Sequence, residues 1–401
     1  MPILQENAGT MFDVIIIGGG PAGCATALSF LKNSKHASCL IIDDANSSSF
    51  KIGESLPPES GRLLHYLHPS LPKQLASQVE CGVHTTCSGN ASAWSSPNLE
   101  ERHAILNPFG HGLHLNRVEF EELLRDTVVK CASGSGSRLA FRKASFKSLQ
   151  KNSQGLWAVE MEENGQRTTI SAKWIVDGTG RKSSVANKIG IKSITLDPLL
   201  AFYAVFIGPE LDRNAGTGDN DRQTLIEATA DGWWYTSLIS HNPPTRIVVF
   251  HTLPSHSSAK SSRRTAGFLD RLHDTTTHVS SVIAKCDYTI QEGYPCCTAA
   301  GSSHLEKTCD GEERWVAVGD AAIAFDPLSS QGMMTALEMG IYVGLKLAQH
   351  VEGGITDGDF DKGVSEAFTG VRKEYEKHRA YYYSIVKRFP GEMFWENIVG
   401  T

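Results

Sequence analysis

The segment FDVIIIGGGPAG, at residues 12–23, constrains the fold of this chain more than any other stretch. An apolar run precedes Gly18, Gly20 and Gly23, which have G-x-G-x-x-G spacing, and a helical pattern begins at Pro21. In this motif the first glycine allows a tight turn, the second lets the backbone approach a pyrophosphate, and the third lets helix and strand pack closely. The start of the helix then directs its N–H groups at the phosphates.

A second apolar run, SCLIIDD at residues 38–44, follows the helix expected at residues 21–32. Strand, helix and strand together form a βαβ unit with parallel strands. An acidic residue at the end of the second strand accepts hydrogen bonds from an adenosine ribose. Asp43 follows Gly23 by 20 residues, and register alone favours it over Asp44. We therefore expect an α/β protein with a Rossmann-like dinucleotide-binding domain.

The segment GDAAIAFDPLSSQG, at residues 319–332, distinguishes between dinucleotides. It follows a short apolar strand, places Asp320 at the end of that strand, and closes with Gly332, where a long helical pattern begins. FAD, unlike NAD, has a ribityl chain and an isoalloxazine ring that must be held. Asp320 can bind a ribityl hydroxyl, and the helix start directs its positive end at the flavin N1–C2=O edge, where negative charge develops on reduction. The two motifs together favour FAD.

The rest of the pattern divides the chain into three parts. Alternating segments within residues 141–176 predict an antiparallel meander, and short β-type runs at residues 199–254 predict a second antiparallel sheet. The polar stretch at residues 255–264 predicts a loop. We expect a discontinuous FAD-binding domain, an antiparallel-sheet substrate domain and a C-terminal helical segment, at residues 11–190 with 300–352, 191–299 and 353–401 respectively.

Charge and hydropathy exclude two classes of function. The 401 residues carry a formal net charge of -6, so the chain has no basic excess for nucleic acid. Apolar runs such as residues 199–207 are too short to cross a bilayer, and residues 1–10 lack the features of a signal peptide. The nine cysteines are scattered without a C-x-x-C pair, which favours reduced structural thiols over a metal site. We expect a cytoplasmic protein with neither nucleic-acid nor membrane partners and no metal.

Five segments, in their order along the chain, resemble the FAD family that includes aromatic hydroxylases, geranylgeranyl-reductase-like proteins and flavin-dependent halogenases. They are GGGPAG, KIGESLPP, GHGLHLNRVEFEELL, IVDGTGRKS and VGDAAIAFDPLSSQG. The resemblance implies that the sheet at residues 199–254 covers the substrate side of the flavin. The expected cofactor-binding residues are Gly18, Gly20, Pro21, Ala22, Gly23, Asp43, Gly53, Glu54, Ser55, Arg117, Asp177, Gly319, Asp320, Pro327, Gly332 and Met333.

Two segments bear on the branch of the family. Tryptophan halogenases, which are similar in the glycine motif and the GES-type loop, also carry a W-x-W-x-I-P segment and an essential lysine. Here the comparable segment GWWYTSLIS lacks I-P, and ECGVHTTCSGNASAW at residues 80–94 contains no lysine. These differences disfavour halogenation.

The tail HRAYYYSIVKRFPGEMFW, at residues 378–395, resembles that of flavoproteins that mature quinone-cofactor oxidases, the partners of lysine ε-oxidase and glycine oxidase. Those flavoproteins oxygenate a tryptophan of a precursor protein, a first step toward cysteine tryptophylquinone. A C-terminal helix that packs its aromatic residues on the core gives the same pattern, and both interpretations can hold. The resemblance implies a precursor protein as partner and leaves the oligomeric state open.

The expected activity is FAD-dependent monooxygenation, in which an indole attacks the distal oxygen of a flavin C4a-hydroperoxide while the protein excludes water and orients the ring. The chain has one G-x-G-x-x-G motif, so NAD(P)H would bind transiently or a separate reductase would deliver electrons. On the strand at residues 232–240, Trp233 and Tyr235 would face one side and Trp234 the other. The candidates for a catalytic role are Glu54, His111, His114 and Trp233.

Alternative functions remain open from the sequence. One is a halogenase or an aromatic hydroxylase acting on a small molecule. Another is a reductase of the geranylgeranyl-reductase type, which would need a long apolar tunnel that the polar residues 255–264 do not indicate. The third is a flavin-fold chaperone that binds an oxidase precursor without catalysis.

Overall fold

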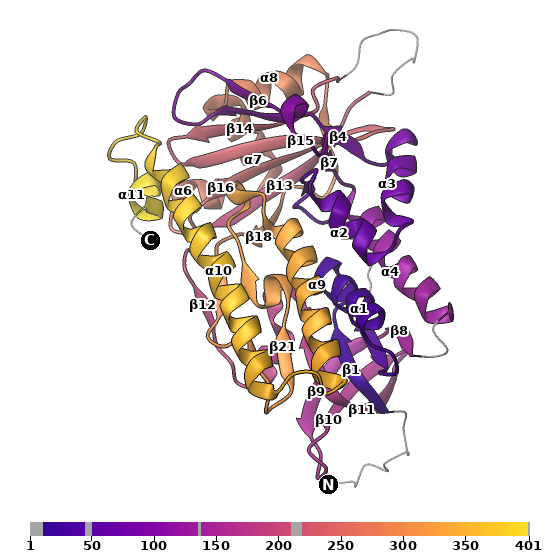
Figure 1. Ribbon diagram of the computed structural model, residues 1–401. Helices are drawn as coiled ribbons and strands as arrows, with labels where there is room; N and C mark the ends of the chain where they lie inside the picture. The colour runs from indigo at the N-terminus through magenta and orange to yellow at the C-terminus, as the bar shows by residue number, and fades with distance from the viewer. Residues whose placement is uncertain (1–10, 45–49, 135–137, 210–218, 400–401) are drawn as a thin grey trace.

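The structure is a computed structural model that describes residues 11–44, 50–134, 138–209 and 219–399 (Figure 1). Two eight-stranded sheets dominate it, with helices packed on both. Residues 1–10, on which the expectation of no signal peptide rests, lie outside the described residues. Within the described ranges, every helix is too short or too polar to span a membrane, and no three His, Cys, Asp or Glu side chains are grouped to hold a metal ion.

The first sheet contains the predicted βαβ unit. β1 (Met11–Ile17) pairs in parallel with β2 (Cys39–Asp43) on one side and with the end of β11 (Gln166–Asp177) on the other, and β8 (Leu139–Lys143) and β21 (Trp315–Ala317) extend the parallel part. Residues 14–17 of β1 are buried, as expected for a parallel strand covered on both faces. In spatial order the strands are β20 (Cys309–Asp310), β21 (Trp315–Ala317), β11 (Gln166–Asp177), β1 (Met11–Ile17), β2 (Cys39–Asp43) and β8 (Leu139–Lys143).

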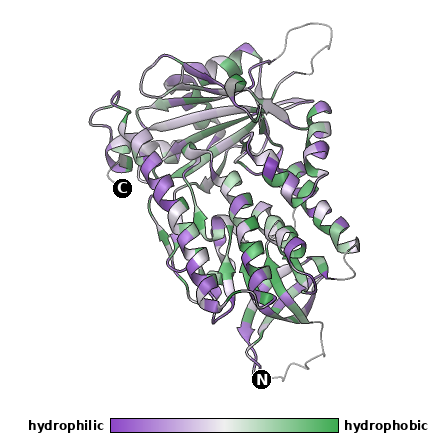
Figure 2. Cartoon of the chain, viewed as in Figure 1, coloured by the Kyte–Doolittle hydropathy of each residue, from purple (hydrophilic) through white to green (hydrophobic). Residues whose placement is uncertain are grey.

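The first half of β11 continues beyond the parallel part into an antiparallel meander. There it pairs with β10 (Trp157–Glu163), which pairs with β9 (Ser145–Lys151). The prediction of a meander that returns to the first sheet is therefore confirmed. Figure 2 shows apolar residues concentrated in the strands of this sheet and on the helices that cover it.

Two helices, α1 (Pro21–Asn33) and α9 (Gly332–Val351), pack tightly side by side on this sheet. A Cβ atom at Gly340 would lie 2.6 Å from the carbonyl oxygen of Ala22, and one at Gly344 would lie 2.4 Å from that of Thr26. The contacts run in the same order along both helices, so the helices are parallel and their N-termini point the same way. α10 (Asp357–Ser384) packs beside α9, and a capping box begins it.

The second sheet contains the antiparallel strands predicted at residues 199–254, and its edge comes from a distant part of the chain. Residues 89–103, which the expected boundary assigned to the FAD-binding part, join this sheet because β5 (Gly89–Ala93) pairs with β14 (Gln223–Thr229). In spatial order the strands are β17 (Thr289–Ile290), β13 (Leu200–Ile207), β16 (Pro244–Thr252), β15 (Gly232–His241), β14 (Gln223–Thr229), β5 (Gly89–Ala93) and β6 (Glu100–His103), and β18 (Cys296–Ala299) also pairs with β13.

Helices cover the outer face of the second sheet. Phe268 and Leu272 of α7 (Thr265–Thr275) and Val279 of α8 (His278–Lys285) share one apolar cluster with Trp234. The prediction of a loop at residues 255–264 is wrong in part, because α6 (Ser257–Ser261) forms there. The His256 side chain accepts a hydrogen bond from the Ser258 amide and caps this short helix, a local signal that composition does not reveal.

The remaining strands form two three-stranded sheets. Among the remaining helices, α4 (Arg117–Gly134) packs against α1 and β8 of the first sheet. The strands are β3 (Ser55–Leu56), β7 (Gly112–His114) and β4 (Thr85–Cys87), then β12 (Ser193–Thr195), β19 (Ser303–Leu305) and β22 (Ile323–Ala324). The helices are α2 (Ser60–Leu67), α3 (Leu71–Glu80), α4 (Arg117–Gly134), α5 (Ser184–Lys188) and α11 (Met393–Val399).

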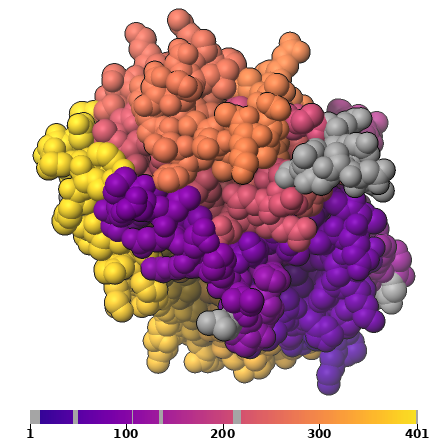
Figure 3. Space-filling model, turned by 90° about the horizontal axis from the view of Figure 1, so that it is seen from above, coloured from indigo at the N-terminus to yellow at the C-terminus, as the bar shows by residue number. Residues whose placement is uncertain are grey.

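The C-terminal segment lies against the second sheet rather than apart from it. Arg388 donates hydrogen bonds to the carbonyl oxygens of Ala93 and Ser96, at 3.1 and 2.9 Å, and the Trp94 indole donates to the Tyr382 carbonyl oxygen at 2.7 Å. Seen from above, the yellow C-terminal segment lies beside a purple segment from the first quarter of the chain (Figure 3).

Candidate functional site

A cavity of about 960 Å³ lies between the two sheets. This volume is at the upper end of the range for small-molecule sites. One side is formed by the glycine loop and the N-terminal ends of α1 and α9, and the other by the inner face of β13, β14 and β15. Thirteen of the sixteen predicted cofactor residues line it, namely Gly18, Gly20, Pro21, Ala22, Asp43, Gly53, Glu54, Ser55, Arg117, Asp320, Pro327, Gly332 and Met333.

A different physical reason explains why glycine occupies each of the three positions of the first motif. Gly18 has a φ of +109°, a conformation that favours glycine, and a Cβ atom there would lie 2.2 Å from the Gly178 carbonyl oxygen. A Cβ atom at Gly23 would lie 1.9 Å from the carbonyl oxygen of Gly18, so this glycine lets the helix approach the strand. Gly20 has ordinary extended backbone angles, and a Cβ atom there would meet nothing within 4 Å. It therefore leaves space for something other than protein.

Two helix N-termini open into this space. Gly20 precedes α1 and Gln331 precedes α9, and neither provides a capping side-chain hydrogen bond. Gly332, like Gly20, lines the cavity, and a Cβ atom there would also meet nothing within 4 Å. First-turn N–H groups and the positive ends of both helix dipoles are thus available to an anionic or polar ligand. A pyrophosphate suits the first helix, and the polar edge of a flavin suits the second.

Two acidic residues, Asp43 and Asp320, line the cavity. Asp43, at the end of β2, accepts a hydrogen bond from the Gly19 amide and so helps to fix the glycine loop. Asp320 lies three residues after the end of β21, and its carboxylate lies 3.5 Å from Nε of Arg181. Desolvation raises the pKa of Asp320, and the nearby Arg181 and Arg117 oppose that rise.

Arg117, the first residue of α4, holds the loop that carries Glu54. It donates to the carbonyl oxygens of Ile52 and Gly53, both at 3.0 Å, and to Glu121 at 2.5 Å. Lys51 also donates to Glu121 at 2.5 Å. Burial would raise the pKa of Glu121, but the two cations hold it below its usual value. The loop is therefore positioned by charge pairs at the cavity wall.

Glu54 and Tyr235 meet where the loop reaches the second sheet. The Tyr235 hydroxyl donates to Glu54 Oε2 at 3.2 Å, and the Gly53 amide donates to the same oxygen at 3.2 Å. Both residues line the cavity. Burial raises the pKa of Glu54, against the hydrogen bonds that favour its charged form. This carboxyl group can therefore hold or release a proton closer to neutrality than an exposed glutamate.

Trp233 and Tyr235 point to the cavity side of β15 and Trp234 points to the helix side, so the predicted alternation is confirmed. The Trp233 ring stacks on His251, with ring centres 3.8 Å apart, and its Nε1 donates to the Tyr383 hydroxyl at 3.1 Å. Trp233 is only 1% exposed, so it contributes a small part of its ring to the lining of the cavity, and because the only donor of the indole is used it contributes no acid or base.

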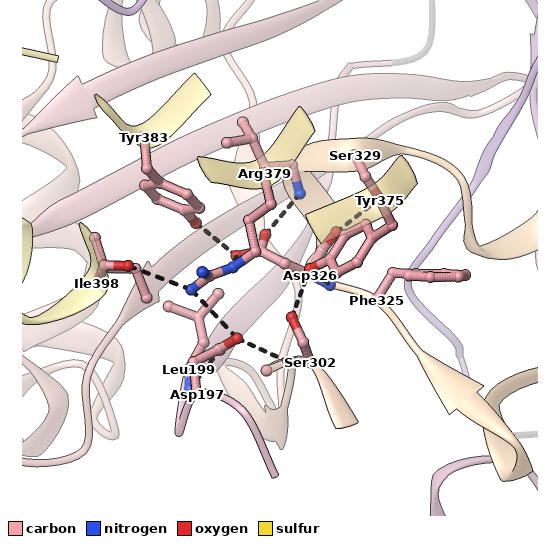
Figure 4. Close-up of polar contacts among 12 residues, drawn as sticks. Asp197, Leu199, Ser302, Phe325, Asp326, Ser329, Tyr375, Arg379, Tyr383 and Ile398 are labelled. Carbon is pink, nitrogen blue, oxygen red and sulfur yellow. Dashed lines mark hydrogen bonds and ion pairs between the residues drawn. The ribbon is translucent and has the colours of Figure 1, made fainter. Parts of the chain in front are cut away.

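A buried polar cluster supports this wall from below (Figure 4). The Tyr383 hydroxyl donates to Asp326 at 2.7 Å, and Arg379 lies 3.7 Å from Asp326 and 3.3 Å from Asp197. Burial raises the pKa of Asp326 to about 6. Asp326 lines the cavity and begins the turn that leads into α9, so α10 is bonded directly to the floor of the cavity.

Three predicted cofactor residues do not line the cavity. Gly23 and Gly319 allow packing instead, since a Cβ atom at Gly319 would lie 2.7 Å from the Ala22 Cβ atom. The Asp177 carboxylate accepts hydrogen bonds from the amides of Val185 and Ala186, both at 2.9 Å. It thereby holds the start of α5 and acts on the site only through the framework.

The two candidate histidines also lie outside the cavity lining. His111 is exposed. His114 is fully buried, with Nε2 2.8 Å from the Thr224 hydroxyl and Nδ1 3.2 Å from the Leu238 carbonyl oxygen. Neither imidazole is placed to exchange a proton directly with a ligand in the cavity.

Four residues that shape the site were not among those expected from the sequence: Arg181, Thr224, Asp326 and Tyr383. Arg181 lies within a segment that carried the family resemblance, so the motif contained a signal for it. Thr224 shares the alternation of its strand with Ile226 and could have been assigned to the inner face by register. Nothing in the local pattern of Asp326 or Tyr383 indicates that they meet, because 57 residues separate them.

Comparison with known proteins agrees with this geometry. Residues 99–367 match a family model described as an FAD binding domain. LodB of Marinomonas mediterranea, described by its name as an FAD-dependent oxidoreductase, is 26% identical over 388 residues, which are 96% of each chain. The flavin-dependent halogenase armH5 of Armillaria mellea is 23% identical over 86% of this chain and 66% of its own. The myxobacterial chondrochloren halogenase CndH shares the fold, with a TM-score of 0.79 and 18% identity over 97% of this chain and 86% of its own.

Proposed function

Because the chain belongs to the FAD-binding domain family, we propose that this flavin-dependent enzyme is a monooxygenase that hydroxylates an indole ring. The natural substrate in this proposal is a tryptophan side chain of a precursor protein. One observation carries the proposal: the two helix N-termini suited to FAD and the aromatic wall of Trp233 and Tyr235 face each other across one cavity. An aromatic ring stacked on that wall would lie beside a flavin held at α9.

The residues that would hold FAD follow from the lining of the cavity. The glycine loop, α1 and Asp43 would hold the ADP half, Asp320 the ribityl chain, and residues 327–333 the ring. FAD when bound supplies the activation of O2. One oxygen atom enters a ring C–H bond, the other leaves as water, and NAD(P)H, binding transiently or through a reductase, supplies two electrons.

The chain's own residues would orient the ring and manage protons. Trp233, fixed by Tyr383 and His251 and almost fully buried, adds a small apolar area beside Tyr235, against which an indole can pack. Glu54 is the titratable group best placed to exchange a proton with the reacting ring, because it lines the cavity and burial raises its pKa. Trp233 would therefore position the substrate, and Glu54 would act as a proton carrier.

Halogenation is the second candidate function, because the relatives include flavin-dependent halogenases. The residues that line the cavity argue against it. The lysines among them are Lys51, which pairs with Glu121, and Lys182, which follows Arg181 at the start of the nucleotide side. No lysine in the described lining comes from the second sheet, where a substrate ring would stack.

The protein nature of the substrate rests on the resemblance of the tail, and LodB, an FAD-dependent oxidoreductase by its name, is similar over 96% of this chain. The C-terminal helix and tail lie directly behind the aromatic wall, because Tyr383 bonds to Trp233 and Trp395 contacts Trp94. A tail that resembles those of oxidase-maturing flavoproteins thus supports the wall of the site from behind, although none of its residues in the described part of the chain lines the cavity. The cytoplasmic location expected from the sequence stays a prediction.

The test uses purified protein, FAD, NADH or NADPH, O2, chloride and bromide, with a tryptophan-containing precursor peptide. Mass spectrometry should find the peptide heavier by one oxygen atom, with no halogenated product. Halogen incorporation would overturn the choice of reaction, and oxidation of NAD(P)H without a modified peptide would contradict a peptide substrate.

The cofactor assignment has its own test. Asp320→Ala should lower the affinity for FAD, measured by flavin fluorescence quenching, while circular dichroism shows a folded chain. Asp310→Ala is the matched control, because Asp310 lies on the neighbouring β20 and pairs with Lys307 outside the cavity lining. Equal flavin affinity in the two variants would remove Asp320 from the site.

A further inference from the structure

A short chain of hydrogen bonds runs from Leu238 through His114 to Thr224. It determines whether the Thr224 hydroxyl group can donate or accept a hydrogen bond in the cavity. His114 Nδ1 lies 3.2 Å from the Leu238 carbonyl oxygen, and a carbonyl oxygen only accepts. Nδ1 must therefore carry the proton and donate it. Burial lowers the pKa of His114 to about 4, so the ring is neutral near pH 7 and its Nε2 is an acceptor.

The state of the imidazole fixes the hydroxyl of Thr224. Nε2 of His114 lies 2.8 Å from Thr224 Oγ1, and an acceptor nitrogen at this distance requires the hydroxyl to donate. A threonine hydroxyl has one hydrogen and two lone pairs. Its single hydrogen is used, so Oγ1 can offer only lone pairs to any other group.

Thr224, which carries those lone pairs, is a residue of the cavity wall. Thr224 lines the cavity together with Ile226 from the same face of β14 and Tyr235 from the adjacent β15. The Cys87 sulfur also interacts with Thr224, but sulfur is a weaker acceptor than the His114 nitrogen, and the thiol itself donates to the Gly89 carbonyl oxygen at 3.4 Å, which leaves the lone pairs of Oγ1 unused. The oxygen is therefore left with acceptor capacity for a ligand in the cavity.

We propose that Thr224 is a specificity-determining residue whose hydroxyl oxygen accepts a hydrogen bond from a ring N–H of the substrate. This inference rests on the proposed function and deepens it, because it states which group of the substrate the cavity wall recognises. An indole has an N–H that only donates, and it therefore matches an oxygen that only accepts. A ring that presents an oxygen at this position would place two acceptors against each other.

His114 acts through Thr224 and is thus a positioning residue. Its role differs from the proton transfer considered from the sequence, since it touches no ligand space. Sites that hydrogen-bond a substrate group reject analogues without it, because the buried partner is then left unpaired. The strength of this rejection is what an experiment can measure.

The experiment compares two probes of nearly the same shape, indole and benzofuran, in which the ring N–H is replaced by oxygen. Binding to the FAD-loaded protein is measured by isothermal titration calorimetry. The wild type should bind indole about 10-fold more tightly than benzofuran, the size of one net hydrogen bond. Thr224→Val, which keeps the shape and removes the oxygen, should bind both probes equally, and Thr224→Ser should restore the preference.

His114→Leu tests the positioning role separately. Without Nε2 the Thr224 hydroxyl is free to donate, so benzofuran should gain affinity and the preference should shrink. If this variant fails to fold, the threonine series still decides. The proposal is overturned if Thr224→Val keeps the preference, if the wild type shows none, or if Thr224→Val weakens FAD binding without changing the ratio. None of these results touches the oxygenation assay, so failure of the site and failure of the proposed function are distinguishable.

Discussion

The two sides of the cavity are built by different means. The side suited to nucleotide is made of backbone: glycine positions without room or need for a side chain, and the N–H groups of α1 and α9. The opposite side is made of side chains that fix one another, such as Trp233 between His251 and Tyr383. A backbone site tolerates few substitutions, while a side-chain wall can be altered one contact at a time.

This difference explains how one fold can keep a cofactor and change its reaction. The geometry of the glycine loop follows from chain sterics, and any ligand with a pyrophosphate meets the same donors. The wall offers only what its particular residues hold in place, including a carboxyl group with a raised pKa at Glu54. We therefore expect substitutions on the first side to affect folding or FAD binding, and those on the second side to affect stability modestly and selectivity strongly.

The largest effect is expected at Gly23. In Gly23→Ala the new Cβ atom would lie 1.9 Å from the Gly18 carbonyl oxygen, so α1 must move away from β1. Overpacking of this kind should lower the free energy of unfolding by about 3 kcal/mol, measured by urea denaturation. Gly61→Ala is the control, because a Cβ atom there meets nothing within 4 Å. A variant as stable as the control would show that the close packing of α1 is not required.

Gly20 separates cofactor binding from folding on the same side. Its backbone angles suit any residue and its Cβ direction is open, so Gly20→Val should unfold at the same urea concentration as the wild type. The valine methyl groups would occupy space that the pyrophosphate needs, and FAD affinity should fall about 100-fold, or about 3 kcal/mol. Flavin fluorescence titration measures this. Unchanged affinity would mean that FAD does not approach this point of the loop.

The buried carboxyl group of Asp326 should make the free energy of unfolding depend on pH. Burial raises its pKa to about 6, so the folded protein holds the proton more tightly than the unfolded chain, in which the pKa is near 4. The stability contributed by protonated Asp326 is complete below about pH 4 and is lost as the pH rises to about 6. Asp326→Asn cannot titrate, so wild type should lose about 2–3 kcal/mol relative to it between pH 4 and pH 7.

Urea denaturation at each pH measures this difference. Asp310→Asn provides the opposite sign, because the pairing of Asp310 with Lys307 lowers its pKa despite partial burial, so its contribution is lost as the pH falls. The groups that face Asp326 are Tyr383, Tyr375, Arg379 and Asp197. If the free energies of unfolding of wild type and Asp326→Asn differ by the same amount from pH 4 to pH 7, one of these groups compensates the negative charge of Asp326.

The two sides of the cavity also differ in how much of their structure could be predicted from the sequence. The glycine motif, the strand before Asp320 and the helix after Gly332 could be read because each depends on neighbours within one turn of chain. The inner face of β15 could be read from alternation, which correctly separated Trp233 from Trp234. The contact of Tyr383 with Asp326 could not be predicted, because it depends on how α10 packs over a turn far away in sequence. The same reason explains why His114 was expected near a reacting group and instead lies behind Thr224.

The smallest expected effect sharpens the comparison on the wall itself. Tyr235→Phe removes the hydroxyl that donates to Glu54 at 3.2 Å and leaves the ring in place. Loss of one buried hydrogen bond should lower the free energy of unfolding by about 1 kcal/mol, whereas FAD affinity should not change. Because the lost donor favoured the charged carboxylate, the pKa of Glu54 should rise further, and the loss of stability should be larger at pH 8 than at pH 5. Urea denaturation at both pH values measures this, with Tyr342→Phe on α9 as the control. An equal loss at both pH values would show that Glu54 does not change its protonation state between pH 5 and pH 8, and a fall in FAD affinity would place Tyr235 on the cofactor side of the cavity.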